Sequence, residues 1–451
     1  MEELRRRLET AGLDEASIAA AFGTAPNPEA ASLHVRRLAA TDPPAVLVQL
    51  FLLGEPVRSD ALPVDAAELE AAGFVERDGD VVRALLRLTP YTGLLLAHDG
   101  ENTKHDPDHV AGLNNSARTA ATFTVRRPVD RALDLGTGSG MQALLAAPHA
   151  RSVVATDVNS RALRYAALNA RLNGVELDLR DGSWFEPVAG EQFDLIVVNP
   201  PYVISPDSQY LYRDSGLAGD TVSRDLVRGA AAHLREGGYA TIMCNWICHN
   251  AGETWQPLEE WVADTGCDAL LLAQKPVDPF HYAARWNEAM RDDPDAYVAT
   301  MERWLDSYER AGIAGIGFGA VLLRRRAGEN WHRGYDLQQP ATGAAGDHLL
   351  RLFAAVDAPL GDDDEVLAAH FALIPGHRLE QRLVYRDDYE LTDVNMLLDE
   401  GVGLVARVDA SALPTLFALD PERPLRAALD DGAEVLPTIR RLYELGFLTK
   451  R

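Results

Sequence analysis

From about residue 130 onward the sequence alternates short apolar runs with amphipathic runs, and no other feature restricts the fold as strongly. The run 193–198, for example, ends in four successive aliphatic residues, which is typical of a strand buried on both faces. Strands and helices that alternate along a chain form a parallel sheet covered by helices. The sequence therefore predicts an α/β domain with a doubly wound sheet. The expected elements are 132–135, 141–147, 152–157, 160–173, 193–198, 221–234, 239–244, 255–265, 269–272 and 313–324.

The length of 451 residues exceeds what one hydrophobic core usually serves, so we expect three domains. Residues 1–100 hold short helical patterns followed by a small hairpin, which predicts a mainly helical, winged-helix-like domain. Residues 101–327 carry the α/β pattern, with an expected helical insertion at 276–310. Residues 328–451 mix helical and strand-like runs, which predicts an α+β accessory domain. Outside the α/β pattern, the expected helices are 2–9, 15–22, 28–39, 45–53, 66–72, 347–355, 364–371, 424–429 and 434–445. The expected strands there are 81–89, 378–385 and 403–408.

Charge and composition limit the partners. The net charge of -25 disfavours long duplex DNA, because gripping a phosphate backbone needs a basic surface. No apolar run approaches the ~20 residues of a membrane span, so we expect no membrane partner. The charged amphipathic start after Met1 and the small number of cysteines, 3, predict a cytoplasmic protein without disulfides.

A glycine-rich turn, 134–140, follows the first expected strand and opens a helix. Such a turn lies at the carboxyl edge of the sheet, where open α/β folds bind ligands, and its glycines let the main chain approach a ligand closely. A dinucleotide fingerprint would need glycine at 141, where Met141 stands, so an NAD site is disfavoured.

Two acids follow the next two strands. Asp157 ends one strand, where a carboxylate can accept hydrogen bonds from both hydroxyls of a ribose. Asp181 follows the third strand, where it could accept the amino group of an adenine. Each acid alone is more often a helix cap or turn residue, but their order after successive strands favours a nucleoside site.

The fourth strand runs directly into Asn199-Pro200-Pro201-Tyr202. The prolines lack N–H groups and fix φ, so this loop cannot continue the sheet and presents its carbonyls rigidly. The Asn199 side-chain oxygen and the Pro200 carbonyl can accept hydrogen bonds from an NH2 group, while the Tyr202 ring stacks on the planar system that bears it. Two such acceptors expose the lone pair of an otherwise poorly nucleophilic nitrogen, so that catalysis is positioning plus electrostatics.

Together these four elements resemble the class I methyltransferases of the HemK/PrmC type, the release factor glutamine N5-methyltransferases, and their relatives that methylate adenine N6 or guanine N2. The resemblance extends from about Arg118 to Gly238 and includes the segment from Tyr212 to Leu217. It implies a Rossmann-like fold, S-adenosylmethionine as cofactor, and methyl transfer to a planar nitrogen of a protein glutamine or a small-molecule amide or amine. The implied catalytic residues are Asn199, Pro200, Pro201 and Tyr202. The implied cofactor-binding residues are Asp134, Gly136, Thr137, Gly138, Gly140, Asp157, Val158, Asp181, Gly182 and Asn199.

Two other functions stay open from the sequence. An RNA or DNA adenine or guanine methyltransferase is suggested by the same loop and by the winged-helix-like ends, with the arginines at 126–127 and 324–326 as an RNA contact. A scaffold with an inactive fold is disfavoured because all four elements are present.

Two residue groups invite functional interpretations that we disfavour. Cys244, Cys248 and His249 lack a second cluster, so we expect a buried strand end and no metal. Tyr282 and Trp286 lie one helical turn apart, which favours packing of the insertion over stacking on a substrate.

Overall fold

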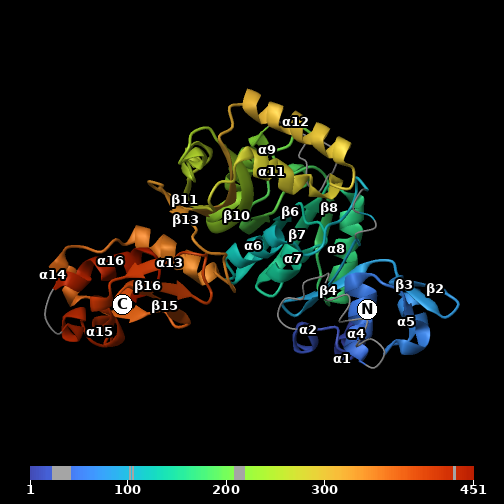
Figure 1. Ribbon diagram of the computed structural model, residues 1–451, viewed down its shortest axis with the longest axis horizontal. Helices are drawn as coiled ribbons and strands as arrows, with labels where there is room; N and C mark the ends of the chain where they lie inside the picture. The colour runs from blue at the N-terminus through green and yellow to red at the C-terminus, as the bar shows by residue number, and fades with distance from the viewer. Residues whose placement is uncertain (23–41, 101–102, 104–105, 208–218, 430–432) are drawn as a thin grey trace. The chain divides into compact units, whose positions relative to one another are not determined.

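The computed structural model describes residues 1–22, 42–100, 103, 106–207, 219–429 and 433–451 (Figure 1). The expected helix 28–39 and the segment from Tyr212 to Leu217 lie outside these ranges. Within the described ranges, every helix is too short or too polar to cross a membrane. The chain divides into two compact units, Met1–Arg118 with Pro128–Gly238 and Thr119–Arg127 with Tyr239–Arg451. The three-domain division at 100 and 327 stays a prediction.

The first unit is built on four parallel strands in the order β9-β6-β7-β8. The strands are β6 (Val129–Leu135), β7 (Ala150–Asp157), β8 (Asp178–Asp181) and β9 (Phe193–Val198). Helices α7 (Met141–Ala146) and α8 (Ser160–Leu172) connect them, and α9 (Thr221–His233) follows β9. This order confirms the α/β fold expected from the alternation, and it brings the carboxyl ends of all four strands to one edge.

Local chemistry explains where α8 begins. The Asn159 side chain accepts a hydrogen bond from the main-chain N–H of Arg161 at 2.9 Å, which caps the helix. Its alanines Ala162, Ala166 and Ala170 are buried, so the helix lies close to its neighbours with little side-chain bulk between them.

The N-terminal residues form short helices and small antiparallel sheets. The helical elements are α1 (Glu2–Thr10), α2 (Glu15–Phe22), α4 (Pro43–Leu47), η1 (Val48–Leu53), η2 (Ser59–Ala61) and α5 (Ala66–Ala71). The strands are β1 (Val57–Arg58), β2 (Val75–Asp78), β3 (Val81–Ala84), β4 (Arg87–Tyr91) and β5 (Leu94–His98). Phe51, Phe74 and Leu8 are fully buried in one core that also includes Leu172 at the end of α8. The single strand expected at 81–89 is two strands, because β3 pairs with β2 whereas β4 turns away to pair with β5.

The second unit contains a mixed sheet. Strand β12 (Gly315–Arg325) pairs antiparallel with β11 (Cys267–Ala273) and with residues 239–248 of β10 (Leu234–Cys248). Strand β13 (His332–Asp336) adds to β11 in parallel. The helix expected at 255–265 is shorter than predicted: α10 covers only Glu259–Val262 and follows a 3-10 turn at Gln256–Leu258. The chain leaves helical geometry just after α10, because Asp264 has a positive φ of 57°.

The expected insertion is helical. Helices α11 (Pro279–Trp286) and α12 (Pro294–Arg310) pack through aromatic side chains, with the ring centroids of Tyr282 and Tyr308 6.4 Å apart. The amide nitrogen of Asn245 on β10 donates to the Tyr282 hydroxyl at 2.6 Å, which places Tyr282 in the interior. Cys244 and Cys248 are likewise buried on β10.

The C-terminal residues mix helices and strands, as expected. The helices are α13 (Gly346–Asp357), α14 (Asp363–Ala368), α15 (Leu413–Phe417) and α16 (Leu436–Glu444). The strands are β14 (Phe371–Leu373), β15 (His377–Tyr385), β16 (Tyr389–Leu398), β17 (Ala406–Val408) and β18 (Leu448–Lys450). The prediction of helix through Phe371 is wrong, because Phe371 begins β14 and pairs with β18. The sequence at 424–429 forms a 3-10 turn, Leu425–Ala428, in place of the expected helix.

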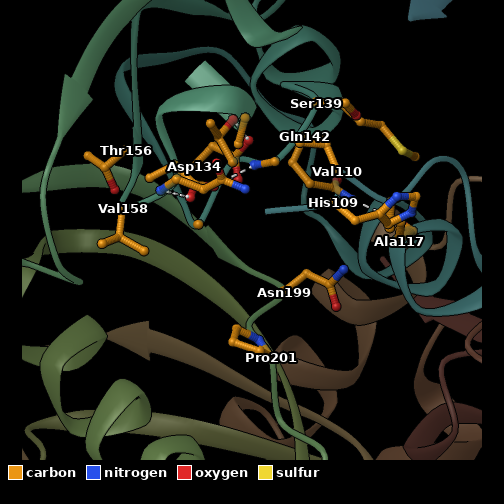
Figure 2. Close-up of a pocket in the computed structure, with 18 of the residues that line it drawn as sticks. His109, Val110, Ala117, Asp134, Ser139, Gln142, Thr156, Val158, Asn199 and Pro201 are labelled. Carbon is orange, nitrogen blue, oxygen red and sulfur yellow. Dashed lines mark hydrogen bonds between the residues drawn. The ribbon is translucent and has the colours of Figure 1, made fainter. Parts of the chain in front are cut away.

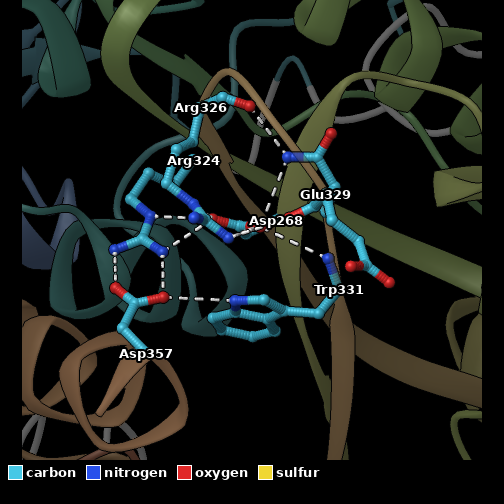
Figure 3. Close-up of polar contacts among 7 residues, drawn as sticks. Asp268, Arg324, Arg326, Glu329, Trp331 and Asp357 are labelled. Atoms are coloured by element: carbon cyan, nitrogen blue, oxygen red, sulfur yellow. Dashed lines mark hydrogen bonds and ion pairs between the residues drawn. The ribbon is translucent and has the colours of Figure 1, made fainter.

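A buried ion network connects α13 to the mixed sheet (Figure 3). Asp268 on β11 is fully buried and accepts hydrogen bonds from Arg324 and Arg326, at 2.6 and 2.7 Å. Arg324 also pairs with Asp357 of α13 at 2.6 Å. The adjacent arginines lower the pKa of Asp268 against the opposing effect of burial, so its carboxylate stays charged. Two of the arginines expected to contact RNA are therefore neutralised by carboxylates.

Candidate active site

A pocket lies where the parallel strands of the first unit end (Figure 2). Its cavity of about 320 Å³ is within the size range of small-molecule sites. Figure 2 shows Asn199 and Pro201 together on one side, and Asp134, Thr156 and Val158 on another. The predicted residues that line the pocket are Asp134, Gly136, Thr137, Gly138, Asp157, Val158, Gly182, Asn199 and Pro201.

The glycine turn presents bare main chain to this cavity. Gly136 and Gly138 have φ of +72° and +55°, and a Cβ built on either would meet no atom within 4 Å. The space beside them is therefore open, so a ligand can lie directly against the main chain. Gly140 differs, because its Cβ would lie 3.1 Å from the Cα of Ala166, so this glycine serves the packing of α7 against α8.

Asp134 supports the turn from below. Its carboxylate accepts hydrogen bonds from the Thr137 hydroxyl at 2.6 Å and from the Ala143 N–H at 2.9 Å. Burial raises the pKa of Asp134 to about 6, although both hydrogen bonds act in the opposite direction. This side chain therefore fixes the turn onto the start of α7.

Asp157 is the carboxylate at the end of β7. Its two oxygens accept hydrogen bonds from the N–H groups of Gly138 and Asn159, both at 2.8 Å. Burial raises its pKa, and the nearby charge of Asp181 adds to that effect, whereas the main-chain hydrogen bonds oppose it. A carboxylate accepts about four hydrogen bonds, so Asp157 keeps acceptor capacity toward the pocket.

Asn199 carries an unsatisfied acceptor. Its side-chain oxygen is buried, and among the residues that the structure describes no group donates a hydrogen bond to it. Leaving a buried acceptor unpaired costs about 1–3 kcal/mol. A group that costs stability in the free protein and faces a pocket suits a ligand that donates a hydrogen bond.

Four of the predicted residues do not line the pocket. Asp181 is exposed at the end of β8, and only its neighbour Gly182 lines the cavity. Tyr202 is buried, and neither it nor Pro200 is among the lining residues. Gly140 is the fourth residue of this group. The expected roles of all four residues stay predictions.

One wall of the pocket, between His109 and Ala117, was not predicted from the sequence. His109, Val110 and Gly112 line the cavity, as do Asn114 and Ala117 further along the chain. No glycine or proline pattern marks this stretch as a ligand wall, and its position depends on contacts far along the chain.

Helix α8 holds this wall in place through a polar stripe at four-residue spacing. Arg161 donates two hydrogen bonds to the carboxylate of Asp99, at 2.8 and 2.6 Å, and Tyr165 donates a third at 2.7 Å. Asp99 in turn accepts from the N–H of Val110 at 2.8 Å.

The same stripe continues with Asn169 and Asn173, each one helical turn after the residue before it. The amide group of Asn169 exchanges hydrogen bonds with both main-chain groups of Ala97, at 2.7 and 2.9 Å, and that of Asn173 does the same with Leu95. Asn169 also donates to the carbonyl of Ser139 at 2.8 Å. One helix face therefore fixes β5, the missed wall and the glycine turn together. Polar residues at this spacing on an otherwise alanine-rich helix are the pattern from which the wall could have been predicted.

Trp184 is a second missed residue. It lines the pocket and has φ of 47°, which is unusual for a bulky side chain. Such backbone strain costs about 1–3 kcal/mol and gathers at ligand sites.

Comparisons with known proteins agree with this geometry. Residues 117–251 match the family model described as "Methyltransferase small domain", and residues 11–85 match "Domain of unknown function (DUF7059)". The release factor glutamine methyltransferase of Xylella fastidiosa is 40% identical over 155 residues, which are 29% of this chain and 56% of that protein. The ribosomal protein uL3 glutamine methyltransferase of Bordetella pertussis is 45% identical over 117 residues, 23% of this chain and 39% of that protein.

The chain spans about half the length of the curated relatives it matches, and the matched part contains the pocket's glycine turn, Asp157 and Asn199. The resemblance named from the sequence is thereby confirmed for this segment. Residues 117–251 of this chain therefore resemble a class I methyltransferase domain by the family model, and part of the chain is similar to glutamine methyltransferases of release factors and of ribosomal protein uL3.

Proposed function

We propose that this protein is an S-adenosylmethionine-dependent methyltransferase that methylates the side-chain amide nitrogen of a protein glutamine. The observation that carries the proposal is the buried, unpaired oxygen of Asn199 at the pocket. An NH2 group is the donor that this acceptor lacks, and a glutamine side chain supplies one.

The pocket fits the cofactor on the evidence of its own residues. Gly136 and Gly138 leave main chain bare beside open space, and Asp157 offers carboxylate oxygens for hydroxyl groups. Val158 lines the same cavity with an exposed apolar side chain suited to a flat ring. S-adenosylmethionine supplies an activated methyl group when bound.

The remaining assignments are part of the proposal. Asn199 and the carbonyl of Pro200 accept hydrogen bonds from the target NH2 group, Pro201 fixes the loop, and the Tyr202 ring stacks on the planar group that bears the target nitrogen. Asp134, Thr137, Gly140, Asp181 and Gly182 support or contact the cofactor. Catalysis then needs only positioning and two fixed acceptors, without a covalent intermediate.

The regions outside the methyltransferase domain belong to the same proposal. The winged-helix-like interpretation of the N-terminal residues, the division at 100 and 327, and cytoplasmic residence are retained as parts of it. The flanking domains would present the acceptor protein to the pocket.

Methyl-labelled S-adenosylmethionine tests the proposal directly. The full chain is incubated with three acceptors from its own cell: a peptide release factor, ribosomal protein uL3, and total RNA. We expect label in one of the two proteins, mapped by mass spectrometry to a glutamine, and loss of label when that glutamine is replaced by alanine. Label in RNA alone would favour the adenine or guanine methyltransferase interpretation and overturn the proposal, as would no transfer to any acceptor.

A further inference from the structure

A second cavity of about 590 Å³ lies within the second unit, apart from the residues of the methyltransferase pocket. Strand β13 and Trp255 form one side, and α13, α16 and the segment at 404–405 form the others. The size is again that of a small-molecule site.

Hydrogen bonds hold the walls of this cavity together. After β13, the Gln338 N–H donates to the carbonyl of Gly403 and the Gln338 side-chain oxygen accepts from the Val405 N–H, both at 3.0 Å. On the opposite wall, the Tyr443 hydroxyl of α16 donates to the carbonyl of Ala358 at 2.8 Å. Walls fixed in this way reduce the ordering that a ligand must impose.

The cavity is rich in unused donors. The Tyr335 hydroxyl, the Trp255 indole N–H and the Arg333 guanidinium have no hydrogen bond or ion pair with any residue in the described ranges. Within the described part of the chain, the ion pair of Arg441 is with the exposed carboxylate of Glu444, at 4.0 Å. The carboxylates of Asp336 and Glu444 also line the cavity, so three arginines and two acids meet there. Cationic donors outnumber the acids, which favours a ligand that brings anionic acceptors.

The chemistry of Tyr335 agrees with this. Burial raises the pKa of Tyr335 to about 12, whereas the charges of Arg333 and Arg441 act in the opposite direction. Both cations are therefore near the phenol, and the hydroxyl remains a donor at neutral pH.

Aromatic and aliphatic side chains also line the cavity. The indole of Trp255 lies directly on β13, because a Cβ on Gly334 would be 1.8 Å from its ring atom Cδ2. The backbone thus supports the ring from behind, and Leu360 and Val405 provide aliphatic surface in the same cavity.

We propose that this cavity binds a small organic anion, with a phosphate or carboxylate group on Arg333, Arg441 and Tyr335 and a flat apolar body against Trp255. The proposal does not depend on the function of the methyltransferase pocket, since no residue is shared. The cavity would give the C-terminal region a ligand-binding role of its own.

Calorimetric titration of the full chain with phenyl phosphate, benzoate and inorganic phosphate tests this site. None of the three contains a nucleoside, and variants of the cavity residues separate binding here from binding in the methyltransferase pocket. We expect one of the two aromatic anions to bind at least about tenfold more tightly than inorganic phosphate, because only it buries an apolar ring. The preferred anion identifies the head group. Absence of binding by both aromatic anions, or equal binding of all three, would overturn the proposal.

Variants locate the binding. Arg333→Gln should weaken it about tenfold or more, since hydrogen bonds to charged groups contribute about 1.5–3 kcal/mol. Tyr335→Phe keeps the shape of the wall and should weaken binding about 3–10-fold, which makes it the second test if Arg333→Gln folds poorly. Arg423→Gln, at an exposed arginine outside the cavity, is the matched control and should bind like the wild type. Unchanged affinity in both cavity variants would show that the anions bind elsewhere and refute the proposed site.

Discussion

Replacing Asn199 by alanine separates its proposed chemical role from a structural one. The side-chain oxygen is buried and accepts no hydrogen bond from the residues that the structure describes, so its removal breaks no described hydrogen bond. Removing one preorganised hydrogen-bonding group at a reacting centre costs about 2.7–4 kcal/mol of transition-state stabilisation, which corresponds to about 10²–10³ in kcat. We therefore expect Asn199→Ala to lose methyl transfer by that factor.

Two further quantities should stay near their wild-type values in this variant. The affinity for S-adenosylmethionine should change less than about threefold, because the glycine turn and Asp157 are untouched. The free energy of unfolding should stay within about 1 kcal/mol of the wild type or rise, because an unsatisfied acceptor is removed.

The assay combines single-turnover transfer, calorimetry with S-adenosylmethionine, and thermal unfolding. Asn199→Asp keeps an acceptor oxygen and should retain more activity than Asn199→Ala. Asn250→Ala, at an exposed asparagine that pairs with Glu253, serves as the matched control. A folded Asn199→Ala variant that transfers methyl groups at the wild-type rate would refute the assigned role of Asn199.

Further predictions concern the turn, the buried acids and the ion network. Asp157→Ala should weaken S-adenosylmethionine binding about 10-fold or more, measured by calorimetry, because hydrogen bonds to a carboxylate are lost; unchanged affinity contradicts this. Gly138→Ala places a Cβ on a residue with φ of +55°, beside the open space of the pocket. It should lower the affinity for S-adenosylmethionine, and it should lower the free energy of unfolding by about 1–2 kcal/mol. Because the pKa of Asp134 is raised from 3.8 to about 6, the native state holds a proton that the unfolded chain releases, and the stability from this group falls as pH rises from about 4 to 6. Asp134→Asn should remove up to about 3 kcal/mol of that pH dependence. Denaturant unfolding of the variant and the wild type at about pH 4 and pH 6 measures this. If the free energy of unfolding changes with pH equally in both proteins, the raised pKa of Asp134 is excluded. Asp268→Ala should destabilise the protein by about 3–5 kcal/mol, because it leaves buried arginine charge without its partner. The control Asp60→Ala, at an exposed aspartate, should have little effect. Equal melting temperatures of the two variants would contradict the role of the network.

The strand ends were predictable because their chemistry is local. Alternating apolar and amphipathic runs specify a parallel sheet, and such a sheet brings its carboxyl ends together whatever the rest of the chain does. Gly136, Gly138, Asp157 and Asn199 therefore line one pocket, as expected from the sequence. Glycine with positive φ and proline without an N–H are constraints that a short segment carries by itself.

The pocket wall from His109 to Ala117 was missed because its anchors are distant in sequence, and the polar stripe on α8 indicates it only indirectly. Asp99 binds Arg161, and Ala97 binds Asn169, across the whole βα unit between them. Asp181 was predicted to lie in the pocket, because it follows the third strand. It is exposed to solvent in the structure, and its neighbour Gly182 lines the cavity. Strand β16 escaped prediction because its outer half is exposed on both faces, so it lacks the apolar alternation of a half-buried strand.

Three features of the pocket oppose folding, and their gathering at one place argues for a ligand site independently of any sequence motif. Trp184 holds a positive φ, Asn199 buries an unpaired oxygen, and Asp134 buries a carboxyl whose pKa is raised to about 6. Each costs on the order of 1–3 kcal/mol, which is a large share of the 5–15 kcal/mol by which a typical domain is stable. Residues that serve only the fold could be replaced without loss at such positions, whereas residues that bind a ligand must bear these costs until the ligand is bound.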